Sequence, residues 1–214
     1  MNRKALAVLC LLLAVFQAFP AMGESGGATF ATVGGFTVTD GMVRLYGIQD
    51  EAARVVAARF GMVPPDLAGL RMDGQTAGLH VLTVGAAAWA AQGAGIHVGD
   101  EAARKRVVEE LFQYPEDQGM EYFGEYARYV TGRFGGSKES LLLAAVPLKK
   151  MEMLADEYLR SAFEGILKNR TDEDATRVLA DSLAAVPVAR QDGAAFEPAY
   201  DWLFQRVFVL RGFR

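Results

Sequence analysis

The chain has 214 residues, of which 51% are hydrophobic and 22% are charged, and its formal net charge is -4. This composition is typical of a globular protein, and it excludes a long disordered acidic tail, a collagenous repeat and a disulfide-stapled miniprotein. The negative charge argues against sequence-independent binding of nucleic acid, which needs clustered lysines and arginines to neutralise phosphates. We therefore expect no nucleic-acid partner.

The first residues have the pattern of a secretory signal. A basic start precedes an apolar run over 5–19, and Ala21 and Gly23 supply small residues just before a cut at Glu24. The run is shorter than the about 20 residues of a membrane-spanning helix. We expect cleavage, no stable membrane span afterwards, and a periplasmic or secreted protein. Cleavage also removes Cys10, the only cysteine, and with it any disulfide or thiol chemistry.

The start of the remaining chain predicts a β-hairpin. Residues 36–39 and 42–46 each alternate apolar and polar side chains. Asp40 and Gly41 between them suit a two-residue turn. Residues 30–33, before a glycine pair, predict a third strand.

Further elements are predicted up to residue 112. Asp50 is a candidate cap for a helix that ends near Gly61. Residues 79–91 are rich in apolar residues and helix formers, which favours a buried helix. Residues 96–98 form a candidate short strand, and Asp100 is a candidate cap for the next helix.

Beyond residue 115 the pattern is almost entirely helical. Apolar residues recur every three or four positions over 120–134, and Ser137 can cap the following helix. Pro147 predicts a break or a kink. Thr171 begins a pattern close to a capping box. The apolar and aromatic segment 202–213 is expected to form either a docking helix or a final strand.

Together these elements predict an α+β protein that is predominantly helical, with a small N-terminal β-hairpin region. We expect a signal peptide over 1–23, a small mixed α/β region over 24–99 and a helical region over 100–214. The last two are either separate or one continuous domain, since a chain of this length can form one sizeable core or two small ones.

The residues of common catalytic and cofactor sites are not arranged in their usual patterns. A catalytic zinc site takes three protein ligands, whereas His80 and His97 lie far from each other and from any cluster of carboxylates in the sequence. Gly-x-Ser-x-Gly, Walker and EF-hand patterns are missing, and the glycines over 93–99 have the wrong spacing for a dinucleotide loop. We expect no metal and no cofactor.

A stripe of tyrosines is the candidate binding surface. Tyr122, Tyr126 and Tyr129 recur at helical spacing, and Arg128 and Arg133 lie nearby. Tyrosine offers flat apolar area together with a hydroxyl group, a combination that is common at binding surfaces. The alternative is that the stripe packs against a neighbouring helix. The leading hypothesis is an exported, non-enzymatic binding or accessory module of the cell envelope, with an unknown protein or glycan partner.

Two other functions fit the sequence. Glu121 and Glu125 lie one helical turn apart and could supply acid-base chemistry in a carboxylate-dependent hydrolase of envelope glycans, although such glutamates also form solvated faces. The C-terminal segment combines Arg206, Arg211 and Arg214 with apolar residues. This combination suits a structural envelope protein that assembles through the segment.

Overall fold

The computed structural model describes residues 27–113, 121–167 and 169–212. About 70% of these residues are helical, and three strands among them form a small antiparallel sheet, two of them near the N-terminus. The predicted α+β class is therefore confirmed. In chain order the elements are β1 (Thr29–Val33), β2 (Phe36–Thr39), α2 (Asp40–Arg59), α3 (Pro65–Ala68), α4 (Gly74–Gly93), α5 (Asp100–Leu111), α6 (Glu121–Phe134), α7 (Lys138–Ala162), the π-helical turn η1 (Phe163–Leu167), α8 (Asp172–Ala184), β3 (Val188–Arg190) and α9 (Tyr200–Gly212).

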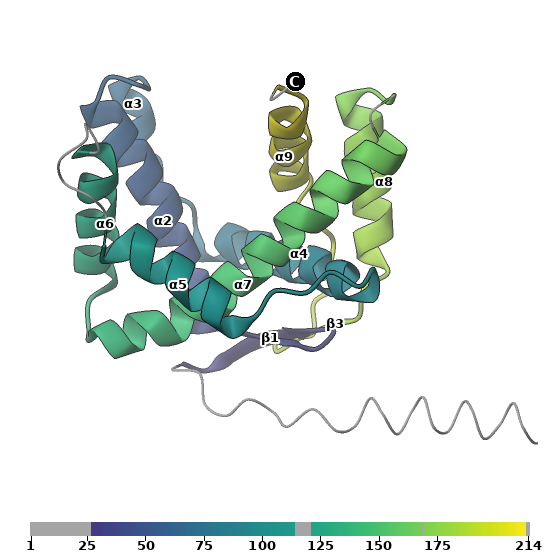
Figure 1. Cartoon of the computed structure of the whole chain (residues 1–214), viewed down its shortest axis with the longest axis horizontal. Coiled ribbons are helices and arrows are strands. Elements are labelled where there is room, and N and C mark those ends of the chain that lie inside the picture. Colours follow the sequence, from purple (N-terminus) through teal and green to yellow (C-terminus); the bar gives the residue numbers. More distant parts are fainter. Residues whose placement is uncertain (1–26, 114–120, 168, 213–214) are drawn as a thin grey trace, which may run out of the picture.

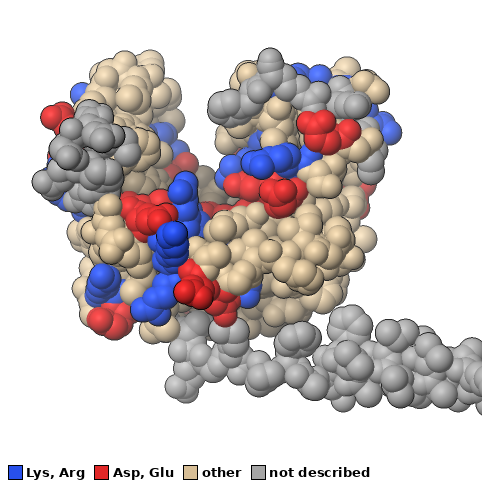
Figure 2. Space-filling view, in the orientation of Figure 1, with Lys and Arg blue, Asp and Glu red and all other residues tan. Residues whose placement is uncertain are grey.

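The helices form two arms on a common base (Figure 1). The first arm consists of α2, α3 and α6, and the second consists of α8, α9 and the end of α7. Helices α4 and α5 and the rest of α7 lie across the base, and the sheet lies below them. Figure 2 shows that the molecule is hollowed between the two arms.

The turn of the hairpin begins at Gly34, and the prediction that placed it at Asp40 is wrong. Gly34 has a φ of 54°, which favours glycine, and an added Cβ atom would lie 2.3 Å from the ring of Trp89. The strand predicted over 30–33 is confirmed as β1, which pairs antiparallel with β2. Strand β3 pairs with the other edge of β1, so the strand order is β2-β1-β3.

The segment predicted as the second hairpin strand is the first part of α2. Thr39 caps this helix, because its Oγ1 accepts a hydrogen bond of 3.4 Å from the backbone N–H of Met42. A five-residue alternation fits one and a half helical turns as well as a strand, and here Met42 and Leu45 are buried on one side of the helix. Asp50, predicted as a cap, lies in the middle of α2, whereas the predicted end near Gly61 is confirmed.

Helix α4 is the buried helix predicted over 79–91, and it begins earlier, at the cap Asp73. Most of its side chains are buried because it packs against the sheet, α2 and α7. Gly78 allows β1 to approach, since a Cβ atom there would lie 2.6 Å from the ring of Phe30. Residues 96–98 form no strand in the described structure and connect α4 to α5, so that prediction is wrong.

Two of the predicted helix caps in the C-terminal half are confirmed. Ser137 Oγ and Thr171 Oγ1 each accept a hydrogen bond from the backbone N–H three residues later, at 3.1 and 3.2 Å. Of the break or kink predicted at Pro147, the break is excluded, because α7 runs through this residue. Leu148 and Met151, which follow the proline, are buried in the core. Their burial offsets the hydrogen bond that proline cannot donate.

One cluster of buried apolar side chains contains residues from both the 24–99 and the 100–214 regions. Of the two alternatives for the C-terminal segment, the docking helix is confirmed, since α9 buries Trp202, Leu203 and Val207. Asp100 is the first residue of α5 rather than its cap. The boundary between the two regions stays a prediction.

The predicted signal peptide over 1–23 lies outside the described residues. In the three ranges that the structure describes, no helix is both long and apolar enough to cross a membrane.

Candidate functional site

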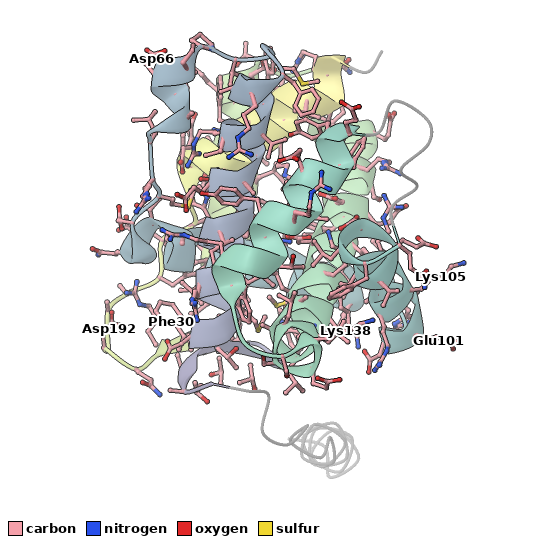
Figure 3. The ribbon with its side chains drawn as sticks, turned by 90° about the vertical axis from the view of Figure 1, so that its left-hand side faces the viewer. Phe30, Asp66, Glu101, Lys105, Lys138 and Asp192 are labelled. Carbon is pink, nitrogen blue, oxygen red and sulfur yellow. The ribbon has the colours of Figure 1, made fainter. Side chains whose placement is uncertain are left out.

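A pocket of the first arm lies between α2, the last turn of α6 and the segment before α4. Its volume is about 620 Å³, within the size range of small-molecule sites. Arg44, Arg71 and Arg133 line it, one from each of these segments, and we call it the arginine pocket. Figure 3 looks onto the first arm, and Phe30, which also lines the pocket, lies beside the lower part of α2.

One face of α2 forms a wall of the arginine pocket. Arg44, Gly47, Ile48 and Glu51 are spaced by three or four residues, so they lie on the same side of the helix. A Cβ atom at Gly47 would have Ala77 as its nearest contact, at 3.8 Å, so this part of the wall is not crowded. The helical spacing of α2 thus places Arg44 and Glu51 on the same wall of the pocket, about two helical turns apart.

Glu51 is a buried carboxylate among cations. Its Oε1 lies 3.0 Å from Nε of Arg71 and its Oε2 lies 3.9 Å from Nε of Arg133. The side chain of Glu51 is only 11% exposed, whereas that of Arg71 is 68% exposed. Burial, and then the neighbouring Glu51, raise the pKa of Tyr129. Glu51 therefore orients the two guanidinium groups at the pocket.

Arg44 is held by groups that carry no charge. Its guanidinium donates a hydrogen bond of 2.7 Å to the backbone carbonyl of Phe134 and lies 5.1 Å from the centre of the Phe134 ring. With Asp40 and Glu51 counted against the three arginines, the pocket lining has one net positive charge. Guanidinium groups bind oxygen anions through paired N–H donors. The arrangement can therefore hold an anion.

A second, smaller pocket lies on the opposite face of α2, where α2 and α6 meet α7. Its volume is about 190 Å³, and we call it the junction pocket. It is lined by Tyr46, Gln49, Asp50, Tyr126, Lys149 and Glu152.

Lys149 of the junction pocket forms ion pairs with two carboxylates. Nζ of Lys149 lies 2.8 Å from both Glu110 and Glu152, and its side chain is only 17% exposed. Burial alone would lower the pKa of Lys149, but the two carboxylates outweigh it, and the pKa is raised. Figure 2 shows positive and negative side chains side by side over the base of the molecule.

Next to the junction pocket, a chain of polar side chains connects α2, α4 and α9. The hydroxyl of Tyr46 lies 3.5 Å from Nδ1 of His80, and Nε2 of His80 lies 3.1 Å from Asp201. Burial raises the pKa of Tyr46, although the charge of Arg206 opposes this shift. These contacts connect three helices that are far apart in the sequence.

The tyrosine stripe lies against α2 and is half-buried. The hydroxyl of Tyr122 donates to the backbone carbonyl of Ala53 at 3.4 Å, and its ring packs edge-on against Phe60. Tyr126 lines the junction pocket, while Tyr129 contacts Glu51 beside the arginine pocket. The three side chains are half-buried and have different neighbours. The binding surface predicted for them stays a prediction.

The charged residues predicted on α6 also separate. Arg133 lines the arginine pocket. Arg128 is exposed and lies 2.8 Å from one carboxylate oxygen of Glu125, whose other oxygen lies 3.0 Å from Arg59. Glu121 is exposed at the first residue of α6. Arginine side chains therefore occupy both carboxylate oxygens of Glu125.

The charged residues predicted at the C-terminus contact the second arm. Arg206 lies 3.4 Å from Asp156 of α7, and Arg211 lies 2.5 Å from Asp172 of α8. Arg214 lies outside the described residues. These ion pairs hold α9 against its neighbours.

Sequence reasoning found Arg133 but missed Arg44, Arg71 and Glu51. The spacing of Arg44 and Glu51 was a usable signal once α2 is treated as a helix, since seven residues make nearly two turns. For Arg71 the sequence offers no signal, because it lies in a connection whose position depends on the packing of α2 and α4. Among the described residues, no group of three or more His, Cys, Asp or Glu side chains is placed to hold a metal ion.

Comparison of the chain with protein families, with curated proteins and with solved structures finds no match.

Proposed function

We propose that the chain is an exported, non-enzymatic binding module that holds an anionic ligand in the arginine pocket. Export rests on the signal pattern over 1–23 and implies a periplasmic or secreted protein of the cell envelope. N-terminal sequencing of protein recovered from the cell tests this part. A chain that begins at Glu24 supports export, whereas an intact Met1 would count against it.

The observation that carries the proposal is the convergence of Arg44, Arg71 and Arg133 on one cavity. Like charges that lie close together repel each other, and the lining has one net positive charge. An anion with oxygen acceptors relieves this repulsion and accepts hydrogen bonds from the guanidinium groups. The pocket thus gains more from an anion than from water or a cation.

Titration with sodium acetate and with inorganic phosphate, followed by NMR of the arginine Nε–Hε signals, tests the site. We expect the signals of Arg44, Arg71 and Arg133 to shift and saturate, and those of Arg128 and Arg177 to stay. The variant R71Q/R133Q should weaken binding by about tenfold or more, because a hydrogen bond to a charged group contributes about 1.5–3 kcal/mol. Small, unsaturable shifts at all five arginines would overturn the proposed site.

The two other hypotheses from the sequence stay predictions. Loss of peptidoglycan hydrolysis in the variant E121Q/E125Q would support the glycan hydrolase. A lower oligomer mass after deletion of 209–214 would support the structural envelope protein.

A further inference from the structure

The arginine pocket is larger than a small anion requires, and part of its lining is apolar. Its volume of about 620 Å³ far exceeds the space that one acetate or phosphate ion fills. Five apolar side chains complete the lining: Phe30, Val43, Ile48, Met72 and Ala77. Val43, Ile48 and Ala77 are buried, whereas a small inorganic anion would leave the half-buried Phe30 and Met72 in contact with water.

We infer that the ligand of this pocket is an amphipathic carboxylate, in which a single negative charge is attached to an unbranched apolar chain. This inference rests on the proposed function, because the same arginines bind the charged head group. The apolar side chains supply the surface against which the chain of the ligand is buried. The ligand class is thus that of a medium-chain fatty acid.

The charge of the lining favours a head group with one negative charge. Asp40 and Glu51 neutralise two of the three arginines, so one positive charge remains. A carboxylate balances this charge, whereas a phosphate monoester carries about -1.5 to -2 at pH 7 and would leave a negative excess. A cationic head group would add to the repulsion between the arginines.

The apolar side chains come from separate segments that meet at the same cavity. Val43 and Ile48 belong to α2, Met72 precedes α4 and Phe30 belongs to β1. Met72 and Phe30 are half-buried, so part of their apolar surface still faces solvent. Covering that surface is favourable, and each buried methylene group of a ligand contributes about 0.8 kcal/mol, or about fourfold in affinity.

Isothermal titration calorimetry of the purified full chain with a set of matched probes tests the inference. The probes are acetate, hexanoate and decanoate, together with decyl phosphate, decanol and decylammonium. We expect decanoate to bind about tenfold or more tightly than hexanoate, because several further methylene groups become buried. Decyl phosphate, decanol and decylammonium should each bind more weakly than decanoate.

Two substitutions separate the head-group site from the apolar wall. R133Q should lower the affinity for decanoate about tenfold, and it should lower the affinity for acetate by a similar factor. M72Q keeps the length of the side chain but makes it polar, so it should weaken decanoate several-fold and leave acetate unchanged. M72L is the matched control, which keeps an apolar wall and should preserve decanoate binding. Thermal unfolding of each variant shows whether the fold is retained.

Each outcome supports or overturns a defined part of the argument. If acetate and phosphate bind but decanoate binds no more tightly than acetate, the amphipathic ligand is overturned and the proposed function stands. If decyl phosphate binds more tightly than decanoate, the single-charge head group is overturned. Equal binding of decylammonium and decanoate would indicate apolar adsorption alone and would also overturn the inference. If no anion binds, the proposed function itself is overturned.

Discussion

The arginine pocket and the junction pocket lie on opposite faces of α2, and they differ in how their charged side chains are paired. In the arginine pocket, the cations outnumber the carboxylates, and Arg71 and Arg133 are largely exposed. In the junction pocket, Lys149 is buried between Glu110 and Glu152. The arginine pocket has one more cation than it has carboxylates, whereas Lys149 of the junction pocket already has two carboxylate partners.

This difference separates a binding site from a structural ion-pair network. A buried ion pair offsets its desolvation cost only when its partners are held in place, so removal of one partner is costly. Exposed charges are screened by water and contribute little to stability, which leaves them available for a ligand. We therefore expect substitutions in the junction pocket to affect folding, and substitutions in the arginine pocket to affect binding.

The largest effect is expected for Lys149→Met in the junction pocket. The substitution removes the cation shared by the half-buried Glu110 and Glu152, of which Glu110 keeps Arg106 as a partner. It should lower the free energy of unfolding by about 2 kcal/mol, between the values for exposed and buried pairs. Lys150→Met is the matched control on the same helix, because Lys150 pairs with the exposed Asp100. It should cost less than about 1 kcal/mol. Urea unfolding measures both, and equal losses would remove the distinction between the two pockets.

Alkaline pH should also lower the stability of the fold through the side chains of the junction pocket. The pKa values of Tyr46, Tyr126 and Lys149 are all raised in the folded protein. A group with a raised pKa in the folded state stabilises the fold below its unfolded pKa, and this stabilisation is lost as the pH rises. Since tyrosine and lysine titrate in unfolded chains near pH 10, we expect stability to fall above about pH 10.

The alkaline loss can be assigned by substitution. Burial, together with the nearby Glu152 and Glu110, raises the pKa of Tyr126, and Tyr126→Phe removes this titration. The variant should show a shallower loss of stability between about pH 10 and 12 than the unaltered protein. Urea midpoints measured across this range provide the comparison. Identical pH profiles would mean that Tyr126 does not contribute.

The smallest effect on stability is expected for Glu51→Gln in the arginine pocket. Because Arg71 and Arg133 are exposed, the loss of Glu51 should cost about 1 kcal/mol or less. The same change frees both guanidinium groups, so acetate affinity should rise about threefold, equivalent to about 0.6 kcal/mol. Glu125→Gln is the control, since Glu125 also pairs with two arginines but lies outside the pocket. An equal gain in both variants would point to net charge rather than to the site.

Local patterns predicted much of the fold. Ser137 and Thr171 were identifiable as caps because a cap depends on residues within one helical turn. The buried helix over 79–91 was also identifiable, since it is apolar on all sides. The hairpin was misplaced because five alternating residues over 42–46 satisfy both a strand and a helix face, and only the cap at Thr39 and the packing of α2 decide between them.

The candidate site was only partly predictable. Arg133 could be found on the predicted α6, beside the tyrosines. The tyrosines share a helical face, but their neighbours differ. Tyr122 packs against the ring of Phe60, Tyr126 lines the junction pocket, and Tyr129 lies beside Glu51. Helical spacing shows which residues share a face. Which side chains that face contacts depends on the other helices and strands that pack against it.

The sequence by itself determined the fold class, the helical character of the C-terminal half and the caps Ser137 and Thr171, because these depend on periodicity and on contacts between near neighbours. The tertiary structure decided which charges meet. Arg44, Arg71 and Arg133 converge only because α2 packs against α4 and α6, and Lys149 is buried between two carboxylates only because α5 packs against α7. The physical reason is that electrostatic and apolar contacts depend on distance in space, which chain order does not specify.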